Sequence, residues 1–561
     1  MDPRKISDSF SSEKITTIKS ELNKVLKTIN VLENQQKIAA EEMVEKKLVE
    51  LSQRSGQILD EKFSELKEEF HGKIMGILND FEEKSRKGAK EVKHIIRGDI
   101  KNEDNQKELF VEKVHVKQSA PISKLLYSKD FQTIYNIFIA ILLNFGIAEL
   151  AKDLLDSTDV LGLNLLAGNF GNIEKVIMMW IAMFVWSFIP VTLVQLVSGG
   201  LSIYLGFFLH ALSVISIFLY GCHFTQEYQL PIASSIVALS ETVRFIMKMH
   251  SYFREKLLHG NGYNKYSHYL PSYAESIGYS EKDLVIPQIN IKDFAKELKR
   301  YTFFLFVPTL IYRDSYPKID KSIRWKNLGV HVFDFFGSIV YTTLIFKAFC
   351  VPTFKEAANN LKDPSKLIIS WIVSMLPGTF VFLLLFFAVM HSWFSIWAEI
   401  LNFADRKFYD DWWNSSDFGT FYRKVSVILY EWMHCYVFID LMRFSNEFIG
   451  QKLARYTVYL LGGICCELVI DLSLGFFSPF LFILISGPGL YMISMKAKTS
   501  RLYNVLVWAM LIIVNGLIIM LYSLEYYSRL QNSYIDPFPK YGLLGYLIPQ
   551  WSLKMSLISI N

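Results

Sequence analysis

The chain has 561 residues, of which 51% are hydrophobic, 15% aromatic and only 20% charged, with a formal net charge of +5; soluble chains carry about a quarter charged residues. Residues 1–120 hold 23 Lys or Arg and 23 Asp or Glu, whereas only about 15% of residues 121–561 are charged. This division predicts a charged arm, residues 1–120, joined to a membrane body, residues 121–561, and it excludes a collagen, a disulfide scaffold, a disordered chain and a soluble enzyme.

The arm carries apolar side chains at alternating spacings of three and four residues: Ile15, Ile18, Leu22, Val25, Ile29 and Leu32. Gln36, Ala39 and Met43 continue the register with one polar position. This pattern predicts a coiled coil that assembles copies of the chain as a dimer or tetramer. The alternative is a single amphipathic helix packed on the body or on the membrane surface. Residues 1–20 are polar and charged, so we expect no cleavable signal peptide.

Charge-free runs in the body predict membrane-spanning helices. Residues 176–226 form the longest run, 51 residues, which is enough for two crossings. Backbone polar groups in lipid must pair within their own segment, so these runs are expected to be helical. We predict an all-α polytopic membrane protein of about nine transmembrane helices. The other candidates are residues 131–148, 367–398, 472–495 and 502–524, with less apolar runs near 230–249, 328–351, 425–443 and 454–471.

Loops rich in Lys and Arg give the expected orientation. Residues 254–300, 313–326 and 406–424 are basic, and basic loops remain in the cytosol, so we expect the arm and the N-terminus on that side. The cysteines lack the spacing of a zinc site, so we expect no metal, and their usage does not indicate a redox compartment. They are Cys222, Cys350, Cys435, Cys465 and Cys466.

Ionisable residues interrupt the apolar segments at many positions. Such residues are costly in lipid and usually face a protein interior or a wet cavity. Each alone is most simply a structural ion pair or a side chain that reaches the membrane surface, but together they predict a polar chamber. A transporter and an intramembrane enzyme both contain such a chamber. The residues are Glu241, Arg244, Lys248, Asp334, His391, Glu399, Glu431, His434, Asp440, Glu467 and Asp471.

The predicted cytosolic loop at residues 402–424 reads NFADRKFYDDWWNSSDFGTFYRK. Its cations, including Arg423 and Lys424, suit phosphate groups, and its aromatic rings can stack on a base or line an acyl chain. The alternative is an aromatic anchor at the membrane interface. Nothing in the chain indicates a nucleic-acid partner.

The same loop resembles a family motif. FYDDWWN at residues 408–414 is similar to the FYxDWWN motif of the membrane-bound O-acyltransferases, in the branch that acts on sterols and diacylglycerol. HSWFSIWAEILNFADR from His391 and PTLIYRDSYP from Pro308 resemble the sterol O-acyltransferases in particular, and ETVRFIMKMHSYFRE from Glu241 also matches the branch. The resemblance extends from about residue 127 to the C-terminus.

This resemblance implies a multi-pass enzyme of the endoplasmic reticulum that forms oligomers. It would transfer a long-chain acyl group from acyl-CoA to the hydroxyl of a sterol or similar lipid alcohol, with no cofactor besides its substrates. In the family, a buried histidine is the base and a nearby asparagine stabilises the developing charge. The resemblance places acyl-CoA beside the loop motif, at Phe408, Tyr409, Asp411, Trp412, Trp413, Asn414, Tyr422 and Arg423.

The chain departs from the family at three polar positions. Aligned on Glu467 and on the FFSP stretch at residues 476–479, the position of the base is Cys466. On the preceding predicted helix, Ser426 stands where the asparagine is expected, and Tyr430 stands where a further histidine is expected. The resemblance therefore gives the reaction class without its usual acid–base groups.

Three interpretations remain open. Cys466, beside Glu467, is a poor base because a thiol is mostly protonated at neutral pH, but it can accept an acyl group as a nucleophile. His434 lies one helical turn after Tyr430 and can act as a displaced base. Alternatively, the chain is an inactive homologue that binds acyl-CoA or sterol, or regulates an active paralogue. The candidate catalytic residues are Cys466, His434, Glu467, Ser426 and Tyr430.

Overall fold

The computed structural model describes residues 113–558, except 114, 127, 157–158, 261–293, 320–321, 362, 445–446, 495–499, 532–535 and 537–546, together with a few positions between residues 20 and 47. The chain divides into two compact units, Met1–Glu108 and Leu109–Asn561. Of the arm's predicted seam, only Val25 and Met43 are described, and both are exposed. The coiled coil therefore stays a prediction.

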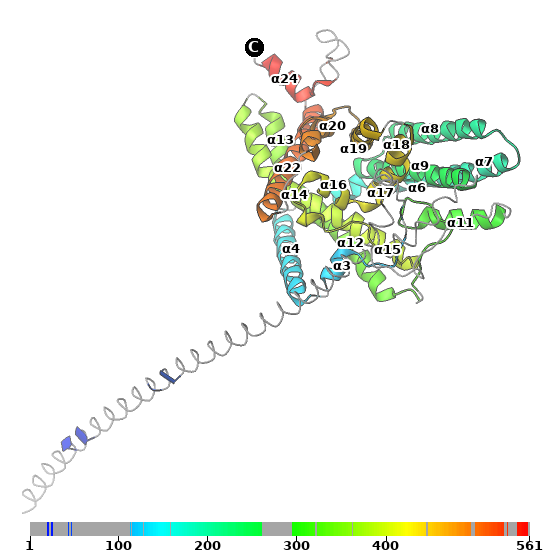
Figure 1. Cartoon of the computed structure of the whole chain (residues 1–561). Helices are drawn as coiled ribbons and strands as arrows, with labels where there is room; N and C mark the ends of the chain where they lie inside the picture. Colours follow the sequence, from blue (N-terminus) through cyan, green and yellow to red (C-terminus); the bar gives the residue numbers. More distant parts are fainter. Residues whose placement is uncertain are drawn as a thin grey trace, which may run out of the picture. The chain divides into compact units, whose positions relative to one another are not determined.

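The described part of the second unit is built from helices, which confirms the all-α prediction (Figure 1). Its helices, after the short α3 (Pro121–Leu125), are α4 (Lys129–Leu155), η2 (Val160–Gly162), α5 (Leu163–Asn169), α6 (Ile173–Trp186), α7 (Ile189–Ser198), α8 (Ile203–Glu227), α9 (Ile232–Gly260), α11 (Phe294–Phe306), α12 (Trp325–Ile345), η5 (Phe346–Cys350), α13 (Val351–Asn359), α14 (Pro364–Phe386), η6 (Phe387–Trp393), α15 (Phe394–Ile400), η7 (Trp412–Asn414), α16 (Phe418–Val425), α17 (Val427–Met433), η8 (His434–Phe438), α18 (Ile439–Phe444), α19 (Glu447–Leu474), α20 (Phe480–Leu484), η9 (Ile485–Gly489), α21 (Leu490–Ser494), α22 (Arg501–Gln531) and α24 (Gln550–Ile558). Extended pairing among the described residues is limited to two isolated bridges, Gln118 with Asp405 and Lys318 with Phe403.

Seven segments of the described chain are long and apolar enough to cross a membrane, or eight if the bent pair α16 and α17–α18 is one span. The sequence predicts about nine. Two of its candidates account for much of the difference: α9 carries three charges in its middle, and the apolar helix at residues 480–493 is short. The seven segments are Lys129–Leu155, Ile173–Ser198, Ile203–Glu227, Trp325–Asn359, Pro364–Ile400, Leu453–Leu474 and Arg501–Gln531.

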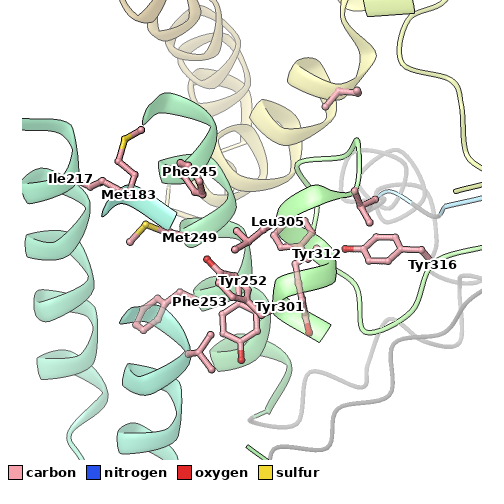
Figure 2. Close-up of a cluster of buried hydrophobic side chains, with 14 of the residues drawn as sticks. Met183, Ile217, Phe245, Met249, Tyr252, Phe253, Tyr301, Leu305, Tyr312 and Tyr316 are labelled. Atoms are coloured by element: carbon pink, nitrogen blue, oxygen red, sulfur yellow. The ribbon is translucent and has the colours of Figure 1, made fainter. Parts of the chain in front are cut away.

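The largest buried cluster lies between α6–α9, α11 and the chain that follows α11 (Figure 2). Phe245, Tyr252 and Phe253 on α9 are fully buried in this cluster, and Tyr252 packs on Tyr301 of α11 with ring centroids 4.7 Å apart. α8 approaches α9 closely at Gly221, where an added Cβ would lie 2.7 Å from the Thr242 hydroxyl oxygen. Burying such large aromatic side chains stabilises this region by about 1.5–3 kcal/mol for each ring.

The charged residues of α9 are bonded within this region. Arg244 donates from two nitrogens to Glu241, each at 2.7 Å, and from a third to a carbonyl of α11. Lys248 donates to three carbonyl oxygens where α11 ends, those of Phe304 (2.6 Å), Leu305 (3.1 Å) and Val307 (2.8 Å). A cation is favourable at the C-terminus of a helix because the last carbonyls carry partial negative charge. These charges thus connect α9 to α11.

α22 packs closely against α14 and also reaches the aromatic loop. An added Cβ at Gly516 would lie 2.7 Å from the Cα of Met375, so only glycine permits this approach. Near the start of α22, Asn504 donates to the carbonyl oxygen of Trp413 at 2.8 Å, and Trp508 donates to the same oxygen at 3.0 Å. The transmembrane packing therefore fixes the position of the loop.

Candidate functional site

Three aromatic residues of the FYDDWWN motif form the interior of the loop. Phe408, Tyr409 and Trp412 are buried, with at most 3% of each exposed. The hydroxyl of Tyr409 lies 2.8 Å from Nδ1 of His391, and the Trp412 ring packs at right angles to Phe386 with centroids 5.0 Å apart. These side chains therefore support the loop from within.

The other predicted acyl-CoA contacts on the loop are more accessible. Asp411 and Trp413 are half-buried and Asn414 is exposed. Lys424 donates to Asp411 at 2.6 Å. Arg423 is exposed, and its guanidinium donates to the Thr420 hydroxyl at 3.0 Å without forming an ion pair with a described residue. Of the two adjacent cations, Arg423 is thus the one available to a phosphate.

A sharp break separates α16 from α17. Asp417 accepts the Thr420 amide at 2.7 Å and caps the start of α16. Ser426 then takes an extended conformation, with φ −141° and ψ 89°, and the two helices meet at 101°. Ser426, where the resemblance predicts an asparagine, is therefore the hinge between the two helices.

The structure brings α16 close to the position where the resemblance predicts the base. Tyr422 on α16 places its hydroxyl oxygen 3.1 Å from where a Cβ of Gly462 on α19 would lie. Gly462 and Cys466 are one turn apart on the same face, and the Cys466 side chain is exposed. The Tyr422 ring also packs at right angles to Tyr459, with centroids 5.3 Å apart. The buried Tyr422 hydroxyl has no hydrogen-bond partner within the described residues.

Glu467 follows Cys466 but makes its bonds elsewhere. It is buried and accepts the Phe482 amide of α20 at 2.6 Å and the hydroxyl of Tyr522 on α22. Asp471, one turn later, accepts the Ser478 amide at 3.3 Å. Both carboxyl groups therefore anchor α19 to the segment that leads into α20.

Tyr430 and His434 lie one turn apart at the junction of α17 and η8. Their rings are nearly parallel, at 20° with centroids 6.0 Å apart, and His434 also stacks on Phe438 at 5.1 Å. His434 is half-buried. Trp432 between them donates to the Ser251 hydroxyl of α9 at 2.8 Å, which fixes one side of α17.

Lys113, His115 and Asp405 form a buried ionic cluster that no pattern in the sequence predicts. Asp405 lies 3.0 Å from Nδ1 of His115 and 3.6 Å from the ammonium of Lys113. Burial alone would raise the pKa of Asp405, but Lys113 and His115 lower it to about 2. Burial lowers the pKa of His115 below its ordinary value. Since nearly 300 residues separate the partners, local periodicity carries no signal for this contact.

Comparison with known proteins identifies the family. Residues 201–524 match the family model described as MBOAT, membrane-bound O-acyltransferase family. The chain is 31% identical over 430 residues to sterol O-acyltransferase 1 of Cricetulus griseus, covering 74% of each chain. It is also 31% identical over 455 residues to sterol O-acyltransferase 2 of Homo sapiens, covering 79% of this chain and 80% of that one. The chain therefore belongs to the membrane-bound O-acyltransferase family, in its sterol O-acyltransferase branch.

Proposed function

We propose that the chain transfers a long-chain acyl group from acyl-CoA to the hydroxyl of a sterol or similar lipid alcohol. The similarity to sterol O-acyltransferases covers about three quarters of this chain and of each relative. The observation that carries the proposal is the contact of Tyr422 with the Gly462–Cys466 face of α19, because it joins the loop motif to the family's base position. Arg423, next to Tyr422, is the proposed phosphate contact of acyl-CoA.

His434 is the proposed proton acceptor. No described residue forms a hydrogen bond with its ring, whose described contacts are the stacked rings of Tyr430 and Phe438. The imidazole would take the hydroxyl proton as the oxygen attacks the thioester carbonyl. The carbon–sulfur bond then breaks, and the imidazolium returns the proton to the CoA sulfur, which leaves as the thiol. In the other enzymatic route, Cys466 first accepts the acyl group and then passes it to the sterol oxygen.

A second candidate function is supported by the same positions. Cys466, Ser426 and Tyr430 replace the expected polar groups together, and Glu467 is engaged by α20 and α22. A chain with these features would bind acyl-CoA or sterol without turnover, or would regulate an active paralogue. Losing one stabilising group typically costs about 100-fold or more in rate.

Ester formation from labelled oleoyl-CoA and cholesterol by the purified chain tests these alternatives. With His434 as base, His434→Ala lowers the rate by about 100-fold or more, whereas the exposed His223→Ala control and Cys466→Ala do not. Loss with Cys466→Ala but not with the neighbouring Cys465→Ala assigns the thiol instead. Saturable acyl-CoA binding without ester, with any hydroxyl acceptor, establishes the inactive homologue and contradicts both enzymatic routes.

We also propose that the chain resides in the endoplasmic-reticulum membrane as a homo-oligomer, with its N-terminus in the cytosol. The apolar seam of the arm supports assembly, and the basic loops support the orientation. Replacing Ile18 and Leu22 by lysine should reduce the mass measured by light scattering in detergent. An unchanged mass would show that the arm does not hold the copies together.

A further inference from the structure

Lys113 lies between two carboxylates that come from distant parts of the body. Its ammonium is 2.5 Å from Oε1 of Glu431 on α17 and 3.6 Å from Oδ2 of Asp405. The three side chains are 13%, 22% and 4% exposed, respectively. With little water to screen them, the two carboxylates would repel each other without the cation.

Gln118, five residues after Lys113, is bonded to residues 402–406, the loop that carries Asp405. Gln118 donates its side-chain amide to Asp405 at 2.6 Å. Its backbone amide donates to Ala404 at 3.0 Å, and its carbonyl accepts the Arg406 amide at 2.9 Å. The carbonyl of Lys113 itself accepts from Arg313 at 3.1 Å. Gln118 is thus fixed to the 402–406 loop and the backbone of Lys113 to Arg313, which limits where the Lys113 ammonium can move.

Glu431 on α17 connects Lys113 to the candidate site. It follows Tyr430 directly and precedes His434 by three residues. Because the chain breaks at Ser426, α17 does not continue the axis of α16, and its orientation depends on lateral contacts. Trp432 supplies one such contact, with α9, and Lys113 supplies another through Glu431.

We propose that Lys113 is a positioning residue: its cation neutralises Glu431 and Asp405, which keeps α17 beside the 402–406 loop and so keeps Tyr430 and His434 in place. The catalytic consequence rests on the proposed function, whereas the contact itself does not. A displacement of reacting groups by about 1 Å costs on the order of 100-fold in rate. Loss of Lys113 is therefore expected to lower turnover more than it alters the KM for acyl-CoA.

The test is a double-mutant cycle in the full chain. Lys113→Met should lower kcat for ester formation at least about tenfold, and Lys113→Arg should retain activity because the cation remains. The double variant Lys113→Met with Glu431→Gln should recover to within about threefold of the parent, since the repulsion between the carboxylates is removed. Lys117→Met is the matched control, because Lys117 is exposed, and it should behave as the parent.

Melting temperature in detergent, measured on the same variants, separates the two proposals. If the parent chain makes no ester, the acyltransferase proposal fails, and recovery of the melting temperature by Glu431→Gln still supports the contact. If Lys113→Met behaves as Lys117→Met in both measurements, or if Glu431→Gln recovers neither, the inference is wrong. If the melting temperature falls with Lys113→Met and recovers in the double variant while kcat never changes, the contact is structural only and the positioning role is wrong.

Discussion

The charged residues of α9 and the face of α19 around Cys466 are two polar regions in apolar surroundings, and their bonding differs. In the first, Glu241 accepts from Arg244 and from Trp180, and Lys248 is bonded to three carbonyl oxygens. In the second, the buried Tyr422 hydroxyl has no partner within the described residues and Cys466 is exposed.

This difference separates structural from functional polarity. A buried polar group without a partner costs about 1–3 kcal/mol, so it persists where a ligand or a reaction uses it. A polar group whose hydrogen bonds are all made within the protein cannot also bind substrate. By this criterion the charged residues Glu241, Arg244 and Lys248 of α9 are structural, and the Tyr422–Cys466 face stays the proposed site.

The largest effect is expected from removing the amino group of Lys248 on α9. Lys248→Met removes a buried donor that three carbonyl oxygens share. Leu305 keeps its bond from Arg244 and Val307 keeps the Thr309 amide, so among the described residues the carbonyl of Phe304 loses its donor. The free energy of unfolding should fall by about 3 kcal/mol. The exposed Lys299→Met on α11 is the control and should change it by less than about 0.5 kcal/mol. Chemical denaturation in detergent, followed by tryptophan fluorescence, measures both. Equal stability of the two variants would contradict a structural role for Lys248.

An intermediate effect is expected at Tyr522 on α22, whose hydroxyl is hydrogen-bonded within the protein although it lies near the proposed site. Tyr522→Phe removes the hydroxyl that donates to Glu467 and that accepts the Leu481 amide at 3.2 Å. It should lower the free energy of unfolding by about 2 kcal/mol. If Tyr522→Phe leaves stability unchanged but abolishes ester formation, Glu467 and Tyr522 belong to the reaction and not to the helix junction.

Much of the fold could be predicted from the sequence because lipid imposes a simple rule. Long charge-free runs must be helical, and residues 131–148, 367–398 and 502–524 indeed lie within helices that can cross a membrane. The rule says nothing of the charges on α9. Each is most simply predicted as a structural ion pair, and together they predict a polar chamber. In the structure Arg244 and Lys248 connect α9 to α11, and only the three-dimensional arrangement shows which carbonyl groups lie within reach.

The candidate site was accessible to sequence reasoning only through motifs. The loop motif predicts Phe408 and Trp412 as ligand contacts, yet both are buried within the loop. The approach of Tyr422 to Gly462 joins segments 40 residues apart, and the link from Lys113 to Glu431 spans 318. Neither contact leaves a periodic pattern, because each depends on the hinge at Ser426 and on tertiary packing.

Thiol accessibility should separate the Cys466 face of α19 from the packed interior by a smaller margin. Cys466 is exposed, whereas Cys350 and Cys435 are buried. A membrane-permeant maleimide should modify Cys466 at least about tenfold faster than either, equivalent to about 1.4 kcal/mol. Mass spectrometry of peptides after timed labelling gives the rates. Comparable rates at all three positions would mean that the α19 face is packed as tightly as the rest of the body.

The smallest effect on stability is expected at Tyr422 itself. Because its hydroxyl has no partner within the described residues, Tyr422→Phe removes no bond and should change the free energy of unfolding by less than about 0.5 kcal/mol, or raise it slightly. The ring contact with Tyr459 is retained. If the hydroxyl serves the reaction, the same variant lowers kcat for ester formation, whereas Tyr459→Phe does not. A loss of stability as large as that of Tyr522→Phe would instead show that the Tyr422 hydroxyl is bonded within the protein. The contrast between the two polar regions would then fail at Tyr422, the residue on which it depends most.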